Sequence, residues 1–114
     1  MSPTPRTKSI VLLLAAYPRR ADATRAAREL VAKGVLACAT VASGAKAFYR
    51  WEGRFHEESS VILWGKTSSR RAASAMKALR ALHPDRVPEI LVLRPGALPA
   101  YAAWVASTTK GKPR

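Results

Sequence analysis

Apolar and polar positions along the chain follow two periods, which divide the first third of the sequence into a strand, a helix and a second strand. Residues 9–16 form a continuous apolar run, which is typical of a strand buried on both faces. From Asp22 the period becomes helical, with an alanine-rich face that predicts close packing on a sheet, and Gly34 is placed to end this helix. Residues 35–41 then predict a second strand, and residues 42–44 predict a loop.

The stretch 47–67 predicts a long hairpin, because two apolar and aromatic arms flank a Glu-Gly dipeptide. Its large aromatic residues are Phe48, Tyr49, Trp51, Phe55 and Trp64. With the two-residue period of a strand, Tyr49 and Trp51 share one face of the first arm. Gly53 supplies the turn, and residues 61–64 carry the second arm into the core. We expect this hairpin to be the signature of the fold and its assembly surface.

The second half of the chain predicts a helix, a short strand and a final helix. The hydroxyl residues 67–69 can cap the first of these helices, and Pro84 ends it because proline cannot continue the hydrogen-bond ladder. Residues 90–93 predict a strand, and residues 98–105 predict a short amphipathic helix. We expect a flexible leader over residues 1–8, a single ferredoxin-like domain over 9–107 and a basic flexible tail over 108–114.

The order of these elements defines the expected fold class. It is α+β: a ferredoxin-like βαββαβ sandwich with an extended hairpin and an extra C-terminal helix. Right-handed crossovers place the first and third strands at the centre of the sheet and both long helices on one face. The other face of the sheet is left bare. Because a small domain does not leave an apolar sheet face in water, the pattern predicts self-association.

Length and composition narrow the class of protein further. A chain of 114 residues with 48% hydrophobic residues predicts one globular domain. A single cysteine excludes an intrachain disulfide framework and a cysteine-rich metal site. The sequence has no apolar run of the ~20 residues that a membrane span needs, and its first apolar run is not followed by a signal-peptide cleavage site. We therefore expect a soluble cytoplasmic protein.

The net charge of +13, from 20 Lys and Arg against 7 Asp and Glu, indicates a second possible function, the binding of a polyanion. Such an excess is typical of proteins that bind nucleic acid or another polyanion. The basic residues are scattered along the sequence, however, and no RNP-like motif, zinc finger or helix-turn-helix accompanies them. Weak, nonspecific attraction to polyanions and simple compositional drift both remain open.

Several segments form a pattern that is fairly specific in combination. They are residues 30–41 (LVAKGVLACATV), 48–53 (FYRWEG), Lys66-Thr67 and 82–90 (LHPDRVPEI), with Tyr101 and Trp104 after them. In order and spacing they resemble the CutA family, the divalent-cation-tolerance proteins, over about residues 9–107. The resemblance implies a ferredoxin-like subunit in a tight homotrimer, with sheets packed edge to edge and hairpins reaching neighbouring subunits. It also implies an architecture similar to PII-type signalling trimers, which bind small ligands between subunits.

The resemblance also indicates candidate metal ligands. In the family, Cys and His at the positions of Cys38 and His83 have been linked with copper, a soft metal that prefers thiolate and imidazole. The residues themselves leave other roles open: Cys38 can be a small core residue of an apolar strand, and His83 can cap the last carbonyls of a helix. His56 beside Glu57 can bind a metal or lie in a solvated turn.

A ligand cleft between subunits is the functional interpretation of these aromatic and charged positions. In it, Lys66, His83 and Glu89 of one chain meet Trp51 and Glu52 of a neighbour. The alternative is that the aromatic residues only anchor the interface. The candidate residues for the cleft or interface are Tyr49, Trp51, Glu52, Lys66, Glu89 and Trp104.

The chain also departs from the family pattern. Ala15-Ala16 stand where the family typically has two threonines, Asp85 stands where it usually has Tyr, and Ser59 and Ser60 stand where it has more acids. These differences weaken the expectation of an acidic, metal-attracting surface.

We expect a non-enzymatic function, because the sequence has no nucleophile elbow, phosphate-binding glycine loop or paired catalytic carboxylates. The favoured function is that of a homotrimeric divalent metal-ion tolerance protein. It would bind copper, another divalent cation or a small ligand at clefts between subunits. The alternatives are a basic module for nucleic acid or another polyanion, and a PII-like trimeric regulatory scaffold.

Overall fold

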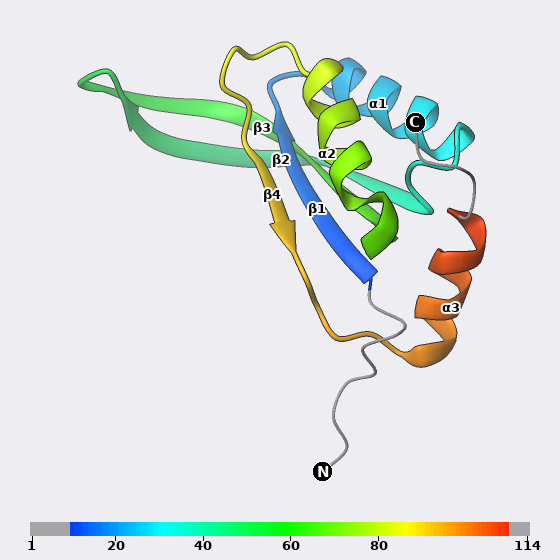
Figure 1. Ribbon diagram of the computed structural model, residues 1–114. Helices are drawn as coiled ribbons and strands as arrows, with labels where there is room; N and C mark the ends of the chain where they lie inside the picture. Colours follow the sequence, from blue (N-terminus) through cyan, green and yellow to red (C-terminus); the bar gives the residue numbers. More distant parts are fainter. Residues whose placement is uncertain (1–9, 110–114) are drawn as a thin grey trace.

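The computed structural model describes residues 10–109, which form four strands, three α-helices and a short 3-10 helix (Figure 1). The strands are β1 (Ile10–Tyr17), β2 (Cys38–Trp51), β3 (Arg54–Ser68) and β4 (Ile90–Leu93). The helices are α1 (Arg20–Ala32), η1 (Ser69–Arg71), α2 (Ala72–Ala81) and α3 (Pro99–Thr108). No helix within residues 10–109 has the length and hydropathy to cross a bilayer. The predicted leader, residues 1–8, lies outside the described part of the chain.

The four strands form one antiparallel sheet in the order β2-β3-β1-β4. The first and third strands therefore lie at its centre, as predicted from right-handed crossovers. Helices α1 and α2 lie side by side on one face of the sheet, and α3 lies at its lower end (Figure 1). The ferredoxin-like α+β fold with an extended hairpin and an additional C-terminal helix is confirmed.

The core lies between the sheet and the two long helices. On β1, alternate residues point toward the helices and are fully shielded from water; they are Val11, Leu13, Ala15 and Tyr17. Helix α1 meets them with Ala23, Ala26 and Leu30. The small alanine side chains let the helix axis approach the sheet closely, which is why this face holds so few large residues.

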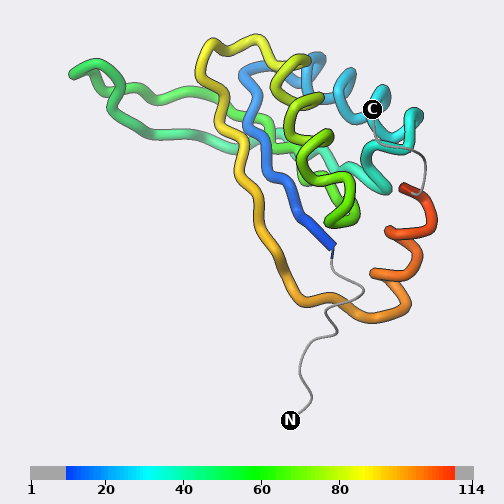
Figure 2. The backbone as a smooth tube through the Cα atoms, in the orientation of Figure 1, coloured from blue at the N-terminus to red at the C-terminus, as the bar shows by residue number. Residues whose placement is uncertain are grey.

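The hairpin of β2 and β3 extends beyond the rest of the domain (Figure 2). Its two arms of 14 and 15 residues are joined by Glu52 and Gly53, with φ of 51° and 76°. Two central residues with positive φ form the turn whose twist suits a hairpin. Gly53 adopts this conformation at little cost, whereas Glu52 is the one non-glycine residue with positive φ in the described chain.

The loop predicted at residues 42–44 is wrong, because β2 continues through it as a single strand. Ala42 pairs with Ile62 and Ala45 with Ser60, so β2 holds one extra residue at this point. This is a β-bulge, and Gly44 accommodates it with φ of 92°. The small residues 42–44 therefore mark a bend in the strand and not its end. The bulge changes the direction of the outer half of the hairpin.

Two further boundaries differ from the prediction. Thr67 belongs to β3, where its hydroxyl donates to the Val35 carbonyl at 2.7 Å, and the N-cap residue Ser68 makes no side-chain capping bond. The flexible tail predicted over residues 108–114 is wrong at its first two residues, because α3 runs to Thr108 and Thr109 is buried; residues 110–114 lie outside the described part of the chain. Arg71 Nε donates to the Thr109 carbonyl at 3.2 Å, and this tertiary contact holds a polar segment that composition alone marks as loose.

The central position of β1 predicts a large effect of Leu13→Ala. Leu13 is completely buried, so its truncation removes apolar burial and leaves a cavity, with an expected loss of about 2–5 kcal/mol in the free energy of unfolding. Leu98→Ala, at a position 71% exposed, is the matched control and should cost less than about 0.5 kcal/mol. Urea denaturation followed by circular dichroism, at one protein concentration, measures both. Equal losses in the two variants would contradict the placement of the core.

Candidate functional site

The sheet face opposite α1 and α2 is apolar and largely uncovered within the described chain, as predicted, and α3 covers only the end at Ile10. Its side chains form rows across the strands, in which Trp64 lies between Thr40 and Leu14, with Leu91 beyond. The exposed fractions are 36% for Trp64, 50% for Leu91 and 44% for Leu93. Leu14 on β1 lies between Trp64 on β3 and Leu91 on β4, so these apolar side chains form a contiguous patch of the kind that is typical of an interaction surface.

Lys66 and Cys38 lie opposite each other on the same open face, toward the α3 end of the sheet. The Lys66 ammonium donates to Thr40 Oγ1 at 3.0 Å and to the Trp64 carbonyl at 3.3 Å. Cys38 is half-buried, so it is not the core residue that its apolar strand would also allow. Burial, and then the neighbouring Cys38 thiol, raise the pKa of the Tyr101 hydroxyl. Tyr101 of α3 therefore lies beside Cys38 at the start of β2.

The Trp104 ring lies on α3, 5.8 Å from that of Tyr101, and is 45% exposed. It therefore borders the open face at the α3 end of the sheet and does not lie near the hairpin residues Tyr49 and Trp51, with which it was grouped as a cleft or interface residue. Trp104 could meet hairpin residues only if they belonged to a second subunit.

A cleft of about 640 Å³ lies between the hairpin and the segment that leads into β4. Its polar side includes Glu58, Asp85 and Glu89, and its aromatic side includes Tyr49 and Trp51. The Tyr49 hydroxyl donates to Glu58 Oε1 at 2.7 Å, and this hydrogen bond is the main reason that the Tyr49 pKa is raised. The cleft thus combines three carboxylates and the guanidinium of Arg86 with four aromatic residues, since Tyr17 and Phe48 line it too.

These carboxylates do not form a metal site within one chain. Among residues 10–109, no group of three His, Cys, Asp or Glu side chains is close enough together to hold an ion. Three carboxylates outnumber the single guanidinium at the cleft, but a complete set of metal ligands would need groups from outside the chain.

His83 has a structural role that the sequence did not reveal. Its ring stacks on Tyr17 with 4.3 Å between centroids, and only 9% of the residue is exposed. Nε2 bonds to the Ala16 carbonyl and so carries the proton, while Nδ1 accepts from the Asp85 amide at 3.1 Å. With both ring nitrogens occupied, His83 is not the helix cap considered above, and metal binding would require breaking one of these bonds.

The structure does not bring Cys38 and His83 together within one chain. Cys38 lies in the row of Leu12, whereas His83 bonds to Ala16, four residues or roughly 13 Å further along β1. His83 also stacks on a side chain that faces the helices, while Cys38 lies on the opposite face of the sheet. One metal ion cannot be shared by the two residues of a single subunit.

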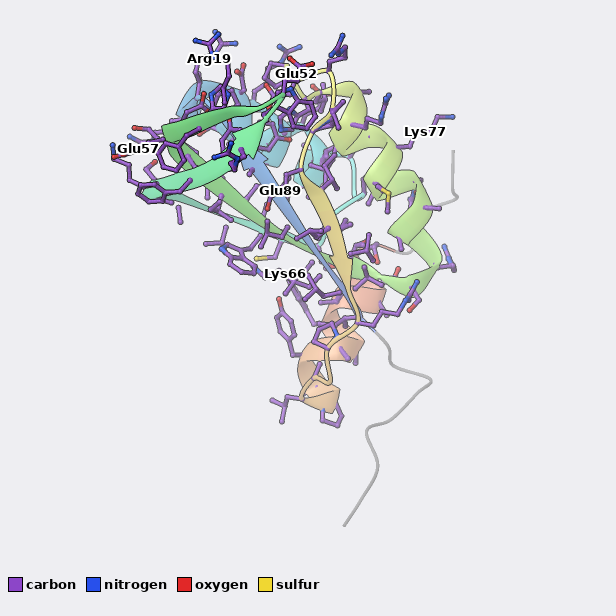
Figure 3. The ribbon with its side chains drawn as sticks, turned by 90° about the vertical axis from the view of Figure 1, so that its left-hand side faces the viewer. Arg19, Glu52, Glu57, Lys66, Lys77 and Glu89 are labelled. Carbon is purple, nitrogen blue, oxygen red and sulfur yellow. The ribbon has the colours of Figure 1, made fainter. Side chains whose placement is uncertain are left out.

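The remaining predicted cleft residues are also separated. Lys66 and Glu89 lie at different levels of the sheet, with Glu52 further away at the hairpin turn (Figure 3). Of the six candidates, Tyr49, Trp51 and Glu89 line the cleft. Glu58 and Asp85 line it too, but the sequence did not reveal them, because they lie 27 residues apart and meet only where the loop after His83 lies beside the hairpin.

The fold and these surfaces define a class of protein: a ferredoxin-like subunit with a protruding hairpin and one uncovered sheet face. The chain matches the family model of the CutA1 divalent ion tolerance protein over residues 11–108, and it belongs to this family. An Escherichia coli divalent-cation tolerance protein CutA is 37% identical over 87 residues, which cover 76% of this chain and 77% of that protein.

Solved structures show the same fold. CutA from Xylella fastidiosa has a TM-score of 0.84 and 31% identity, covering 88% of this chain and 97% of that one. CutA from Synechococcus elongatus PCC7942 has a TM-score of 0.84 and 28% identity, covering 95% and 96%. The similarity therefore spans nearly the whole described chain.

Tyr17 leads to a prediction for alkaline pH. Its hydroxyl is buried without a hydrogen-bond partner among residues 10–109, and burial, helped by Asp22, raises its pKa from 10.0 to about 12. The folded protein keeps a proton that the unfolded chain loses above pH 10, so stability falls as the pH rises from 10 toward 12. Tyr17→Phe should be neutral or stabilising at pH 8 and should lose less stability than the parent by pH 11.

Denaturant unfolding of both proteins at the two pH values measures this difference. An equal loss of stability in the parent and in Tyr17→Phe would contradict the raised pKa of the buried hydroxyl.

Proposed function

We propose that this CutA1-family protein is a homotrimeric, non-enzymatic divalent metal-ion tolerance protein that binds its ion at clefts between subunits. The observation that carries the proposal is the uncovered apolar sheet face beside a cleft that holds three carboxylates. Its relatives are described as divalent-cation tolerance proteins, which supports the cellular role. A cytoplasmic location is part of the same proposal.

Assembly through the open face supplies what a single chain lacks. Covering Trp64, Leu91 and Leu93 with another subunit removes their apolar surface from water, at about 25 cal/mol per Å². The hairpin carries further exposed aromatic residues, Phe48 at 60% and Phe55 at 65%, beyond the body of the domain. These residues, with Trp51 and Glu52 near the turn, are placed to contact a neighbour.

The chemistry of the cleft favours a hard divalent cation over copper. Glu58, Asp85 and Glu89 offer carboxylate oxygens, the ligands that Mg²⁺, Ca²⁺ and Mn²⁺ prefer, whereas copper favours sulfur and nitrogen. Glu52 of a neighbouring hairpin would add a fourth carboxylate. A copper site at Cys38 would need ligands from another subunit, because His83 already uses both ring nitrogens.

Charge introduced on the open face should prevent assembly. Trp64→Glu places a carboxylate among Leu14 and Leu91, and burying an unpaired charge there costs several kcal/mol, so the oligomer should dissociate. Val31→Glu makes the same kind of change on α1, on the other side of the sheet, and should leave the oligomer intact. Native mass spectrometry reports the mass of both. If the Trp64→Glu variant kept the oligomeric mass of the parent, the proposal that this face is the interface would be contradicted.

The ion is tested by calorimetric titration with Mn²⁺ and, separately, with Cu²⁺. Glu58→Gln/Glu89→Gln should weaken Mn²⁺ binding at least about tenfold, since each lost charge assists coordination by a kcal/mol or more. Glu29→Gln/Glu57→Gln, which removes two carboxylates outside the cleft, is the control and should bind as the parent does. Cu²⁺ binding that disappears in Cys38→Ala, together with Mn²⁺ binding indifferent to the cleft variant, would show a soft-metal site in place of the one proposed.

A further inference from the structure

The positive charge of the chain is concentrated on one layer of the fold, although it looks scattered in the sequence. The segments 19–33 and 69–81, which form the helix layer, hold nine basic side chains and two acidic ones. The hairpin segment 46–58, in contrast, holds three basic and three acidic side chains and is neutral overall. The charge therefore distinguishes one face of the molecule.

Both acidic residues of the helix layer are already paired. Arg19 contacts Asp22 at 2.8 Å, and Lys33 contacts Glu29 at 3.0 Å. Arg20, Arg25 and Arg28 on α1, and Lys77 and Arg80 on α2, are exposed; within residues 10–109 none of these five forms an ion pair. Their charge is thus available to a partner.

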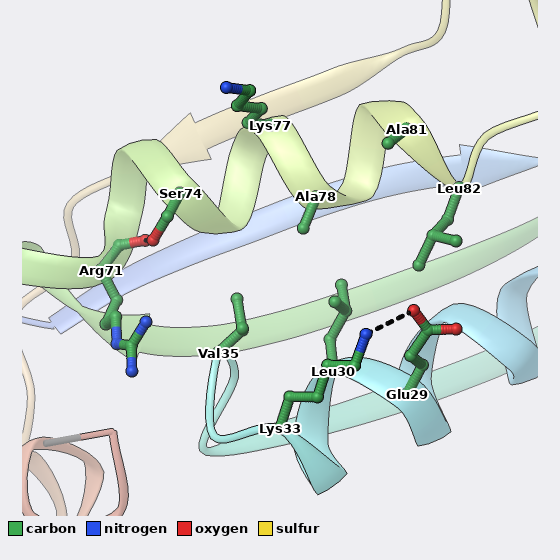
Figure 4. A pocket seen from close by; sticks show the side chains of 10 residues that line it. All are labelled: Glu29, Leu30, Lys33, Val35, Arg71, Ser74, Lys77, Ala78, Ala81 and Leu82. Atoms are coloured by element: carbon green, nitrogen blue, oxygen red, sulfur yellow. Dashed lines mark hydrogen bonds and ion pairs between the residues drawn. The ribbon is translucent and has the colours of Figure 1, made fainter. Parts of the chain in front are cut away.

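Four of these five cations line two hollows in the helix layer. Arg20, Arg25 and Arg28 border a shallow depression of about 730 Å³ on the outer side of α1, with Thr24 between them. A groove of about 830 Å³ separates α1 from α2, with Lys33 and Lys77 at its rim and an apolar floor that includes Leu30 and Ala78 (Figure 4). In Figure 4 the Lys77 side chain points outward, away from the floor.

We infer that this outer face of the helix layer, defined by Arg20, Arg25, Arg28, Lys77 and Arg80, docks the phosphate backbone of double-stranded nucleic acid without sequence specificity. Guanidinium groups form paired hydrogen bonds with phosphate oxygens, and three of them side by side on one helix suit a row of phosphates. Helices α1 and α2 contain no aromatic residue. The surface therefore lacks the stacking platforms that single-stranded binders use, and contact to the backbone of a duplex is the mode that remains.

The same composition argues against a membrane surface as the partner. Helices that lie on membranes insert large apolar or aromatic side chains, but the depression on the outer side of α1 is lined by three arginines, Ala21, Thr24 and Glu29, whose carboxylate is paired with Lys33. The helix layer is also opposite the open sheet face, so covering that face with other subunits leaves the helix layer accessible (Figure 1). Docking of nucleic acid and assembly through the sheet do not compete for one surface.

Fluorescence anisotropy with a labelled 20-base-pair DNA duplex tests the inference on the full chain. Arg25→Gln/Arg28→Gln should weaken binding roughly tenfold or more near 0.1 M salt, and should lower the slope of log K against log salt by about 2, because each lost phosphate contact contributes ~0.9. Arg50→Gln/Arg54→Gln removes the same charge from the hairpin and should leave the slope and the affinity close to those of the parent. Native mass spectrometry verifies that both variants keep the parent's oligomeric state.

Equal losses in the two variants would overturn the inference, since binding would then depend on net charge and not on this face. Absence of duplex binding by the parent at 0.1 M salt would overturn it as well. Sedimentation with vesicles of anionic phosphatidylserine provides the other arm: binding to vesicles that depends on Arg25 and Arg28, without duplex binding, would assign the face to a membrane.

Discussion

The structure depends on a single constraint: the two long helices, α1 and α2, cover only one of the two apolar faces of the four-stranded sheet. On the covered face, Val11, Leu13 and Ala15 pack against α1 and α2 and leave no exposed surface. On the other face, Trp64, Leu91 and Leu93 have no cover within the described chain. Fully burying one such side chain contributes about 1.5–3 kcal/mol, a large share of the stability of a domain of this size. Association with other copies is the direct way to gain it.

The hairpin also exposes apolar side chains that a single subunit leaves uncovered. Its two-residue turn at Glu52 and Gly53 permits arms longer than the body of the domain needs, and the bulge at Gly44 turns their outer half. The turn residues and exposed aromatic rings thereby project away from their own core. The cleft that holds Glu58 and Glu89 forms where the hairpin leaves the body. In the proposed trimer, a cation bound there would be shared with a neighbouring subunit.

Much of the fold could be predicted from the sequence because it depends on local period. The apolar run of β1, the alanine stripe of α1 and the Glu-Gly turn each determine a local structure, and crossover handedness then orders the strands. Interactions between distant segments could not be predicted in this way. Thr109 is bonded by Arg71, β2 continues through residues 42–44 by pairing with β3, and Nε2 of His83 bonds to the Ala16 carbonyl of β1. The helix layer's excess charge likewise appears only once α1 and α2 lie side by side.

The three surfaces of the subunit are thus chemically distinct: an apolar sheet face, an acidic cleft at the base of the hairpin and a basic helix layer. The first of them is the central claim, because the cleft is completed and the helix layer is left outermost only if the sheet face is covered. Multi-angle light scattering of the parent protein across a dilution series from high to low micromolar concentration tests it most directly. The account predicts a constant mass of three times the 12.4 kDa of one chain. A mass of a single chain at micromolar concentration would contradict it.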